Sequence, residues 1–210
     1  MLKLFKRKTD AGRSDSSWPP TGSMMTLQQR KIYKPPLNLS AQKAEHADIT
    51  DDEFWAIVPK VYDYTELPVA ILYNLYSAIR YVISSGVPGD IVECGVHMGG
   101  SVMAAEHTLL KFNPSNDRRI FALDTFTGFV TRHEELDVDL QTGAVACDPS
   151  DTFDFSEHSI ANMKSVPFDS LNVIKGDVLQ TIPTLKVDKI ARLRLDTDTY
   201  ETTKFELEHL

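Results

Sequence analysis

The stretch Ile91-Val-Glu-Cys-Gly-Val-His-Met-Gly-Gly-Ser101 decides the fold, because a short apolar run leads directly into a turn rich in glycine. Residues 91–96 are typical of a buried strand, and helical periodicity predicts a helix over residues 101–112. Glycines in such a turn let the backbone pass close to a ligand at the start of the following helix. The stretch therefore predicts the first strand, turn and helix of an open α/β fold.

The same alternation of strand and helix continues along the chain. Further strands are predicted over residues 119–124, 171–176 and 190–196. A last helix begins near Tyr200, and two amphipathic helices precede the first strand. Thr50 is expected to cap the first of these, with Glu53 in the capping-box position, and Pro68 is expected to open the second. This order of elements predicts a parallel sheet with right-handed crossovers, preceded by a helical region.

The composition places the chain among ordinary globular proteins. Its 210 residues are 42% hydrophobic and 25% charged, and no apolar run approaches the ~20 residues of a membrane span. Two cysteines, Cys94 and Cys147, cannot form a disulfide framework, so we expect a reducing, cytoplasmic setting. The basic start is followed by no apolar segment of the kind found in secretory signals.

Charge divides the chain into a basic arm and an acidic body. Residues 1–35 hold eight Lys and Arg against two Asp, a net charge of +6, and the remaining residues carry −14. So acidic a body disfavours nucleic acid as a partner, because nucleic-acid binding depends on neutralising phosphates. We expect an irregular basic arm over residues 1–45, a helical cap region over residues 46–88 and the α/β domain over residues 89–210. The arm is either solvated or in contact with an anionic surface.

The segment over residues 134–157 is acidic and has neither helical nor strand periodicity. It contains eight Asp and Glu and no Lys or Arg. A long insertion of this kind between two strands is either a lid or substrate loop, or a plain solvated loop. As a substrate loop it would favour a cationic acceptor.

Carboxylates stand at the end of every predicted strand: Glu93, Asp124, Asp177, and the pair Asp196 and Asp198. In an open α/β sheet, ligands bind beyond the carboxyl ends of the strands. Four acids meeting at one edge would repel each other unless a cation or a hydroxyl-rich ligand lies there. The alternative for Glu93 and Asp177 is that each caps the start of a helix.

The position of Glu93 bears on the cofactor. A carboxylate two residues before Gly95 opposes the pyrophosphate of a nicotinamide dinucleotide, whereas it suits the ammonium and sulfonium groups of S-adenosylmethionine (SAM). Asp124 would then accept from the ribose hydroxyls, and Asp177 would lie where the adenine amino group can be met. An NAD-dependent Rossmann enzyme remains as another alternative.

Asp196 and Asp198 lie on the same side of an extended segment, because side chains alternate along a strand. Two carboxylates there can hold a divalent cation, or divide into a metal ligand and a general base. Alternatively, Asp198 caps the last helix with Glu201 as its capping-box partner.

Four segments resemble the TylF-type macrocin O-methyltransferase family, in the same order along the chain. They are Gly89-Asp-Ile-Val-Glu-Cys-Gly-Val-His-Met-Gly-Gly-Ser101, Leu123-Asp-Thr-Phe-Thr-Gly128, Lys175-Gly-Asp-Val-Leu-Gln-Thr-Ile-Pro183 and Leu193-Arg-Leu-Asp-Thr-Asp-Thr-Tyr-Glu-Thr-Thr-Lys204. The helix around Tyr73-Asn-Leu-Tyr-Ser-Ala-Ile-Arg-Tyr-Val82 is similar too, so the resemblance covers about residues 50–210. It implies a Rossmann-like SAM-methyltransferase sheet. It also implies an O-methyltransferase that depends on SAM and magnesium and acts on a small-molecule hydroxyl, in a sugar or phenolic part of a natural product.

The resemblance also implies roles for individual residues. The implied SAM-binding residues are Thr65, Glu93, Gly95, Val96, Gly100, Ser101, Asp124, Thr125, Phe126 and Asp177. Thr65 would approach the methionine end of SAM, and Asp177 would face its adenine. Asp196 corresponds to a magnesium ligand and Asp198 to the general base. The metal would acidify the acceptor hydroxyl, Asp198 would take its proton, and the oxygen would attack the SAM methyl group.

Three departures from the family pattern qualify the resemblance. His97 and Met98 replace a tryptophan and a basic residue, so we expect His97 to pack rather than to catalyse. Arg192 stands at an apolar position of the family. The family continues into a strand that supplies two more metal-binding acids. We therefore expect a C-terminally truncated sheet whose strand over residues 190–196 is an unpaired edge. The chain is then either a fragment or a homo-oligomer that pairs this edge, and the functional alternative is a non-catalytic SAM-binding remnant or oligomerising fragment.

Overall fold

A computed structural model describes residues 35–113, 117–138 and 154–210. Four parallel strands form one sheet in the order β3-β2-β1-β4, so the predicted parallel α/β architecture is confirmed. The strands are β1 (Asp90–Cys94), β2 (Ile120–Asp124), β3 (Leu171–Lys175) and β4 (Ile190–Leu195). Each lies within two residues of its predicted position, because each is a short apolar run bounded by turn residues.

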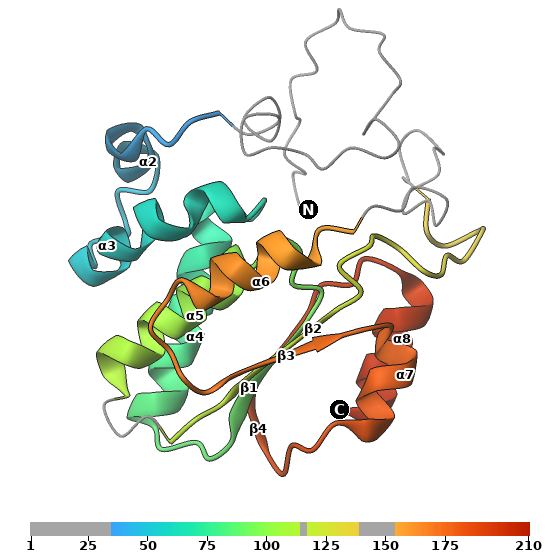
Figure 1. Cartoon of the computed structure of the whole chain (residues 1–210). Coiled ribbons are helices and arrows are strands. Elements are labelled where there is room, and N and C mark those ends of the chain that lie inside the picture. Colours follow the sequence, from blue (N-terminus) through green and yellow to red (C-terminus); the bar gives the residue numbers. More distant parts are fainter. Residues whose placement is uncertain (1–34, 114–116, 139–153) are drawn as a thin grey trace, which may run out of the picture.

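Helices cover both faces of the sheet, so that the sheet is the middle of three layers (Figure 1). One face carries α3 (Asp52–Val61), α4 (Val69–Ser84), α5 (Gly100–Phe112) and α6 (Ser156–Lys164). The other carries α7 (Val178–Thr181), the 3-10 turn η2 (Ile182–Thr184) and α8 (Tyr200–His209). Two hydrophobic clusters fill the spaces between the layers, and alternate residues of β1 enter them: Ile91 the larger and Val92 the smaller. Among the described residues, no helix is both long and apolar enough to cross a membrane.

The helix boundaries correct two expectations. Asp51, not Thr50, caps α3, because its side chain accepts from the backbone N–H groups of Glu53 and Phe54. Pro68 occupies the N-cap position of α4, one residue before the first helical residue. Both differences are a shift of one residue at a helix start, where several neighbouring residues have capping or turn-forming side chains.

The short helical elements that were not predicted include α2 (Leu39–Glu45), the 3-10 turn η1 (Tyr62–Tyr64) and α6, besides η2. The first lies in the arm that we expected to be irregular, and Asn38 caps it. The third lies at the end of the acidic segment, and two of its three buried residues are Ser156 and Ser159. A helix that packs through serines has no apolar periodicity, so the sequence pattern could not reveal it.

A carboxyl group is buried inside the helical layer. Glu106 of α5 is 0% exposed, and neither of its oxygens has a hydrogen-bond partner among the residues described. Burial raises the pKa of Glu106 from 4.5 to about 9, so the folded protein keeps this group protonated at neutral pH. The unfolded chain releases the proton near its ordinary pKa. Between these two values the folded state therefore binds more protons, and its stability falls as the pH rises.

We expect Glu106→Gln to flatten the dependence of stability on pH. In the wild type, this group lowers the free energy of unfolding by on the order of 3 kcal/mol between pH 4 and pH 7. Glu206, whose pKa is raised to about 7 by burial, adds a slope of the same sign that ends near pH 7, and the variant keeps this contribution. Denaturant titrations between pH 4 and pH 9 measure the effect, with Glu157→Gln on the exposed face of α6 as the control. An unchanged slope in Glu106→Gln would contradict the assignment.

Candidate cofactor site at the carboxyl ends of the strands

Asp124, at the end of β2, holds the glycine-rich turn that follows β1. One carboxylate oxygen, Oδ2, accepts from the backbone N–H groups of Val96 (2.6 Å) and His97 (2.7 Å). The other, Oδ1, accepts from the N–H of Phe126 (2.7 Å). The sequence predicted that Asp124 lies at this edge of the sheet, but it did not predict that Asp124 holds the turn through hydrogen bonds to its backbone. Its expected bond to ribose hydroxyls stays a prediction, and those hydroxyls would share oxygens that already accept from the backbone.

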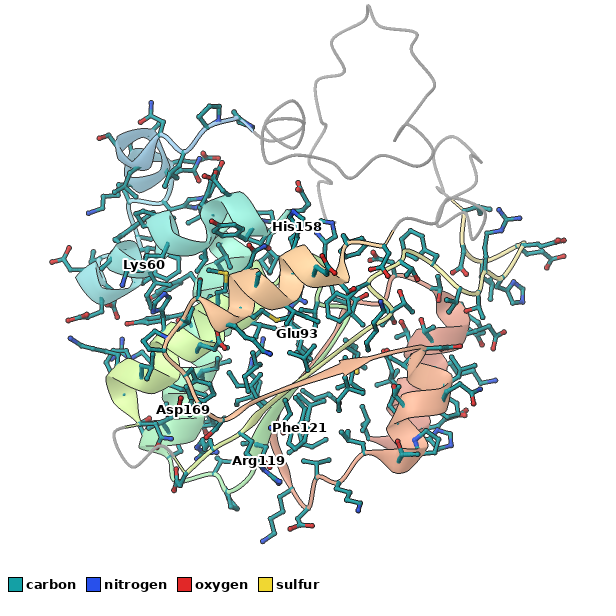
Figure 2. The ribbon with its side chains drawn as sticks, in the orientation of Figure 1. Lys60, Glu93, Arg119, Phe121, His158 and Asp169 are labelled. Atoms are coloured by element: carbon teal, nitrogen blue, oxygen red, sulfur yellow. The ribbon has the colours of Figure 1, made fainter. Side chains whose placement is uncertain are left out.

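Glu93 has a cation of the protein itself as its partner. The carboxylate is 1% exposed and lies between the sheet and α5, on the face opposite Phe121 (Figure 2). The hydroxyl of Ser101 and the Nη1 atom of Arg194, the latter at 2.9 Å, both donate to its Oε1. Burial raises the pKa of Glu93, and Arg194 and Ser101 oppose that shift. Glu93 therefore binds a side chain of α5 rather than capping its first N–H groups.

Arg194 was not among the predicted site residues, although the strand pairing explains its place. Parallel pairing of β1 with β4 sets Glu93 opposite Arg194, and side chains paired in this way lie on the same face. An arginine within a predicted buried strand was the available signal, because such a charge needs a partner. The same guanidinium also donates from Nη2 to Oδ2 of Asp196 (2.5 Å). Arg194 thus bridges Glu93 and Asp196, the expected metal ligand.

The ends of β1 and β4 approach so closely that only glycine fits at position 95. The backbone N–H of Asp196 donates to the carbonyl of Cys94 (2.8 Å). A Cβ atom on Gly95 would overlap the carbonyl of Asp196 and lie 2.9 Å from the backbone nitrogen of Thr197. Gly95 also has φ +83°, a region that side chains disfavour. This contact places Asp196 directly beside the glycine-rich turn.

Asp198 lies two residues beyond, in a strained conformation. Its φ is +65°, and its side chain is exposed. Partial desolvation raises the pKa of Asp198, and the neighbouring Asp196 adds to the shift. The N-cap position of α8 belongs to Thr199. The capping role considered for Asp198 is therefore wrong.

The remaining predicted residues lie around the same turn or next to it. Thr65 is buried against the start of α5, where a Cβ atom on Gly100 would lie 2.7 Å from the Cβ atom of Thr65. Thr125 donates its hydroxyl to the carbonyl of Gly128 (2.7 Å), and Phe126 is fully buried. The approach to Gly100 places Thr65 beside the turn, whereas Thr125 and Phe126 directly follow Asp124 at the end of β2. Their contacts with SAM stay predictions.

Asp177 caps α7. Its Oδ1 accepts from the N–H of Leu179 (3.0 Å), so the capping interpretation is confirmed for this residue. The contact of Asp177 with adenine stays a prediction. It would use the second carboxylate oxygen.

Helix α6 packs on the glycine-rich turn and accounts for the unusual pair at 97 and 98. Asn162 donates its side-chain amide to the carbonyl of Met98 (3.0 Å), and Ser159 donates its hydroxyl to the Met98 sulfur (3.7 Å). The ring of His97 meets Phe155 edge-on, with 5.6 Å between centroids. The packing role expected for His97 agrees with this contact.

The described residues do not by themselves make a magnesium site. Within residues 35–113, 117–138 and 154–210, no group of three or more His, Cys, Asp or Glu side chains could hold a metal ion. Asp196, the expected ligand, already accepts from a guanidinium.

The fold resembles those of known methyltransferases. The O-methyltransferase NovP has a similar structure, with a TM-score of 0.55 and 25% identity, over 70% of this chain and 61% of that one. The calicheamicin methyltransferase CalS11 shares the fold, with a TM-score of 0.54 and 19% identity, over 95% of this chain and 79% of that one. The sheet and its helices therefore have the Rossmann-like fold of methyltransferases.

Residues 4–210 match the macrocin-O-methyltransferase (TylF) family, and the chain belongs to that family. Mycinamicin III 3''-O-methyltransferase of Micromonospora griseorubida is 28% identical over 160 residues, 70% of this chain and 59% of the relative. Demethyldecarbamoylnovobiocin O-methyltransferase of Streptomyces niveus is 28% identical over 142 residues, 67% of this chain and 54% of the relative. The chain thus spans little more than half the length of these relatives.

We expect Gly95→Ala to be far more damaging than Gly86→Ala. Both glycines have positive φ, but a Cβ atom on Gly86 meets nothing within 4 Å. Gly86→Ala should therefore cost about 1–2 kcal/mol from backbone strain alone. Gly95→Ala should cost several kcal/mol more, because β1 and β4 must separate. Denaturant unfolding of the two variants measures the difference, and equal losses would refute the contact.

We expect Arg194→Met to lower the free energy of unfolding by about 3–5 kcal/mol, because it leaves Glu93 buried without its cation. Adding Glu93→Gln to Arg194→Met should recover much of the loss. Lys111→Met, which removes the partner of the exposed Glu53, should cost less than about 1 kcal/mol, because both side chains of this pair are exposed. Chemical denaturation of these variants supplies the values. Strictly additive effects of the changes at 93 and 194 would show that the pair is not coupled.

Proposed function

We propose that this chain catalyses, or forms the cofactor-binding part of, a SAM-dependent O-methylation of a small-molecule hydroxyl. One observation carries the proposal. In a chain of the TylF family, the glycine-rich turn, Asp124, Asp196 and Asp198 lie together at the carboxyl ends of β1, β2 and β4. This edge is where open α/β sheets bind their ligands.

SAM is proposed to lie along the turn over residues 95–101. Asp124 would accept from its ribose, Asp177 would face its adenine, and Thr65 would contact its methionine end. The strand-end acids favour this cofactor over a dinucleotide, because SAM carries no phosphate and bears two cationic groups at neutral pH. Arg194 neutralises only part of their charge, since Glu93 and Asp196 share it.

Asp198 is proposed as the general base. It would accept the proton of the acceptor hydroxyl as the oxygen attacks the SAM methyl group in line with sulfur. The new O–CH3 bond forms as the S–CH3 bond breaks, with its electron pair passing to sulfur. The products are a methyl ether and S-adenosylhomocysteine, with the proton on Asp198. No step is assigned to magnesium, because the described residues do not complete a site for it.

The proposed acceptor is a sugar hydroxyl of a natural product. The names of two relatives support this class. One is the mycinamicin III 3''-O-methyltransferase, and the other is an enzyme of Streptomyces olivaceus named for the 4' position of a rhamnosyl tetracenomycin, 29% identical over 147 residues. A phenolic hydroxyl is the alternative within the same chemistry.

Calorimetric titration with SAM and then with NAD tests the cofactor. We expect saturable binding of SAM and none of NAD, because the acids at the strand ends around the turn oppose a pyrophosphate and suit a cation. Binding of NAD without SAM would overturn the proposal. Binding of SAM without turnover on any acceptor would support a non-catalytic SAM-binding protein instead.

Asp198→Asn tests the base. Release of S-adenosylhomocysteine in the presence of methyl α-L-rhamnoside and, separately, phenol should fall by about 10²–10⁴-fold, while the Kd for SAM stays unchanged. Asp188→Asn, an exposed acid before β4, serves as the matched control and should retain full turnover. A variant at 198 with wild-type turnover would rule out this role.

A further inference from the structure

Asp137 is a buried acid in the segment that follows β2. Asp137 is 7% exposed, whereas the nearby Glu134 and Glu135 are exposed. Its Oδ2 accepts from the N–H of His133 (2.7 Å), and its own N–H donates to the carbonyl of His133 (2.9 Å). These two bonds close residues 133–137 into a tight turn with the carboxylate directed inward.

The other oxygen of Asp137 reaches the first residue of α8. Oδ1 accepts from the N–H of Tyr200 at 2.8 Å, across 63 residues of sequence. Thr199 at the N-cap position makes no side-chain cap bond, and its hydroxyl pairs with that of Thr202 (2.6 Å). Asp137 therefore supplies the cap that α8 lacks locally, and its negative charge suits the positive end of the helix dipole. The ring of His133 adds an edge-on contact to the ring of Tyr200, with 5.5 Å between centroids.

Asp198 lies between two fixed points. On one side, the N–H of Asp196 is bonded to the carbonyl of Cys94, and on the other the N–H of Tyr200 is bonded to Asp137. Only residues 197–199 span the interval, and Asp198 takes a φ of +65° within it. A non-glycine residue persists in that conformation only where the surrounding structure imposes it.

We propose that Asp137 is a positioning residue that holds the turn carrying Asp198 and thereby ties the segment after β2 to the site. The inference rests on the proposed function for the role of Asp198, but the hold itself is independent of it. It also reassigns one acid of the 134–157 segment, because a carboxylate committed to α8 and His133 is not free to attract a cationic acceptor.

Three variants of the full chain test the inference. Asp137→Ala removes the cap, Asp137→Asn keeps an oxygen for the Tyr200 N–H, and Glu134→Gln removes an exposed charge from the same segment. Hydrogen exchange of the backbone amides at 198–201 should speed up about tenfold in Asp137→Ala and much less in Asp137→Asn. Glu134→Gln should match the wild type.

Turnover separates positioning from a general loss of structure. In Asp137→Ala, kcat for methyl transfer to methyl α-L-rhamnoside should fall about tenfold, with the Kd for SAM within about twofold of wild type. Asp137→Asn should restore most of the kcat. Unchanged exchange at 198–201, or a Kd that rises as much as kcat falls, would overturn the inference. If the wild type shows no turnover, the proposed function fails on that arm, and the exchange measurement still decides whether Asp137 holds the turn.

Discussion

The passage of the Asp196 backbone against Gly95 is the constraint on which the site depends. Two parallel strands end there at nearly the same level, and the chain leaves one of them through a residue without a side chain. Because the contact joins backbone to backbone, it fixes the backbone position from which the side chains of Asp196 and Asp198 extend, independently of the side-chain conformations. The glycine-rich turn is then fixed from the other side by Asp124.

This arrangement concentrates negative charge, and Arg194 relieves it only in part. A buried carboxylate such as Glu93 is costly to desolvate, so its bonds to Ser101 and Arg194 are requirements of the fold rather than additions to it. The same guanidinium is shared with Asp196, while the described partners of Asp124 are three backbone N–H groups and the Thr125 hydroxyl, all uncharged. The edge thus keeps an excess of acids over cations. That balance suits a ligand with a positive centre, and it follows from the structure without reference to the family.

The sequence predicted the strands and long helices because their signals are local. Each strand is an apolar run next to a glycine or an acid, and α4 has a clear apolar stripe. Helix α6 was missed because it packs through serines, and α2 because its residues are mostly exposed. The predicted site residues that surround the turn did gather there, because topology alone brings strand ends together.

The partners of those residues could not be predicted, since they come from distant parts of the chain. Arg194 reaches Glu93 across 101 residues, and Asp137 reaches Tyr200 across 63. Neither pair has a spacing that a sequence pattern can register. Strand register decides the first pair, and the path of an irregular segment decides the second.

For the acidic segment over residues 134–157, composition alone predicts the wrong role for some of the acids, because it does not show which residues they bond to. As a run of like charges it suggested a loop that attracts cations. Yet Asp137 caps α8, and Asp154 accepts from Lys175 Nζ (2.8 Å) and from Ser156 at the start of α6. Residues 139–153 lie outside the described structure. On each described flank, an acid bonds to a distant element: Asp137 to the start of α8, and Asp154 to Lys175 at the end of β3. Asp137 and Asp154 thus fix the two described flanks of the segment, whereas Glu134, Glu135 and Glu157 on the same flanks are exposed.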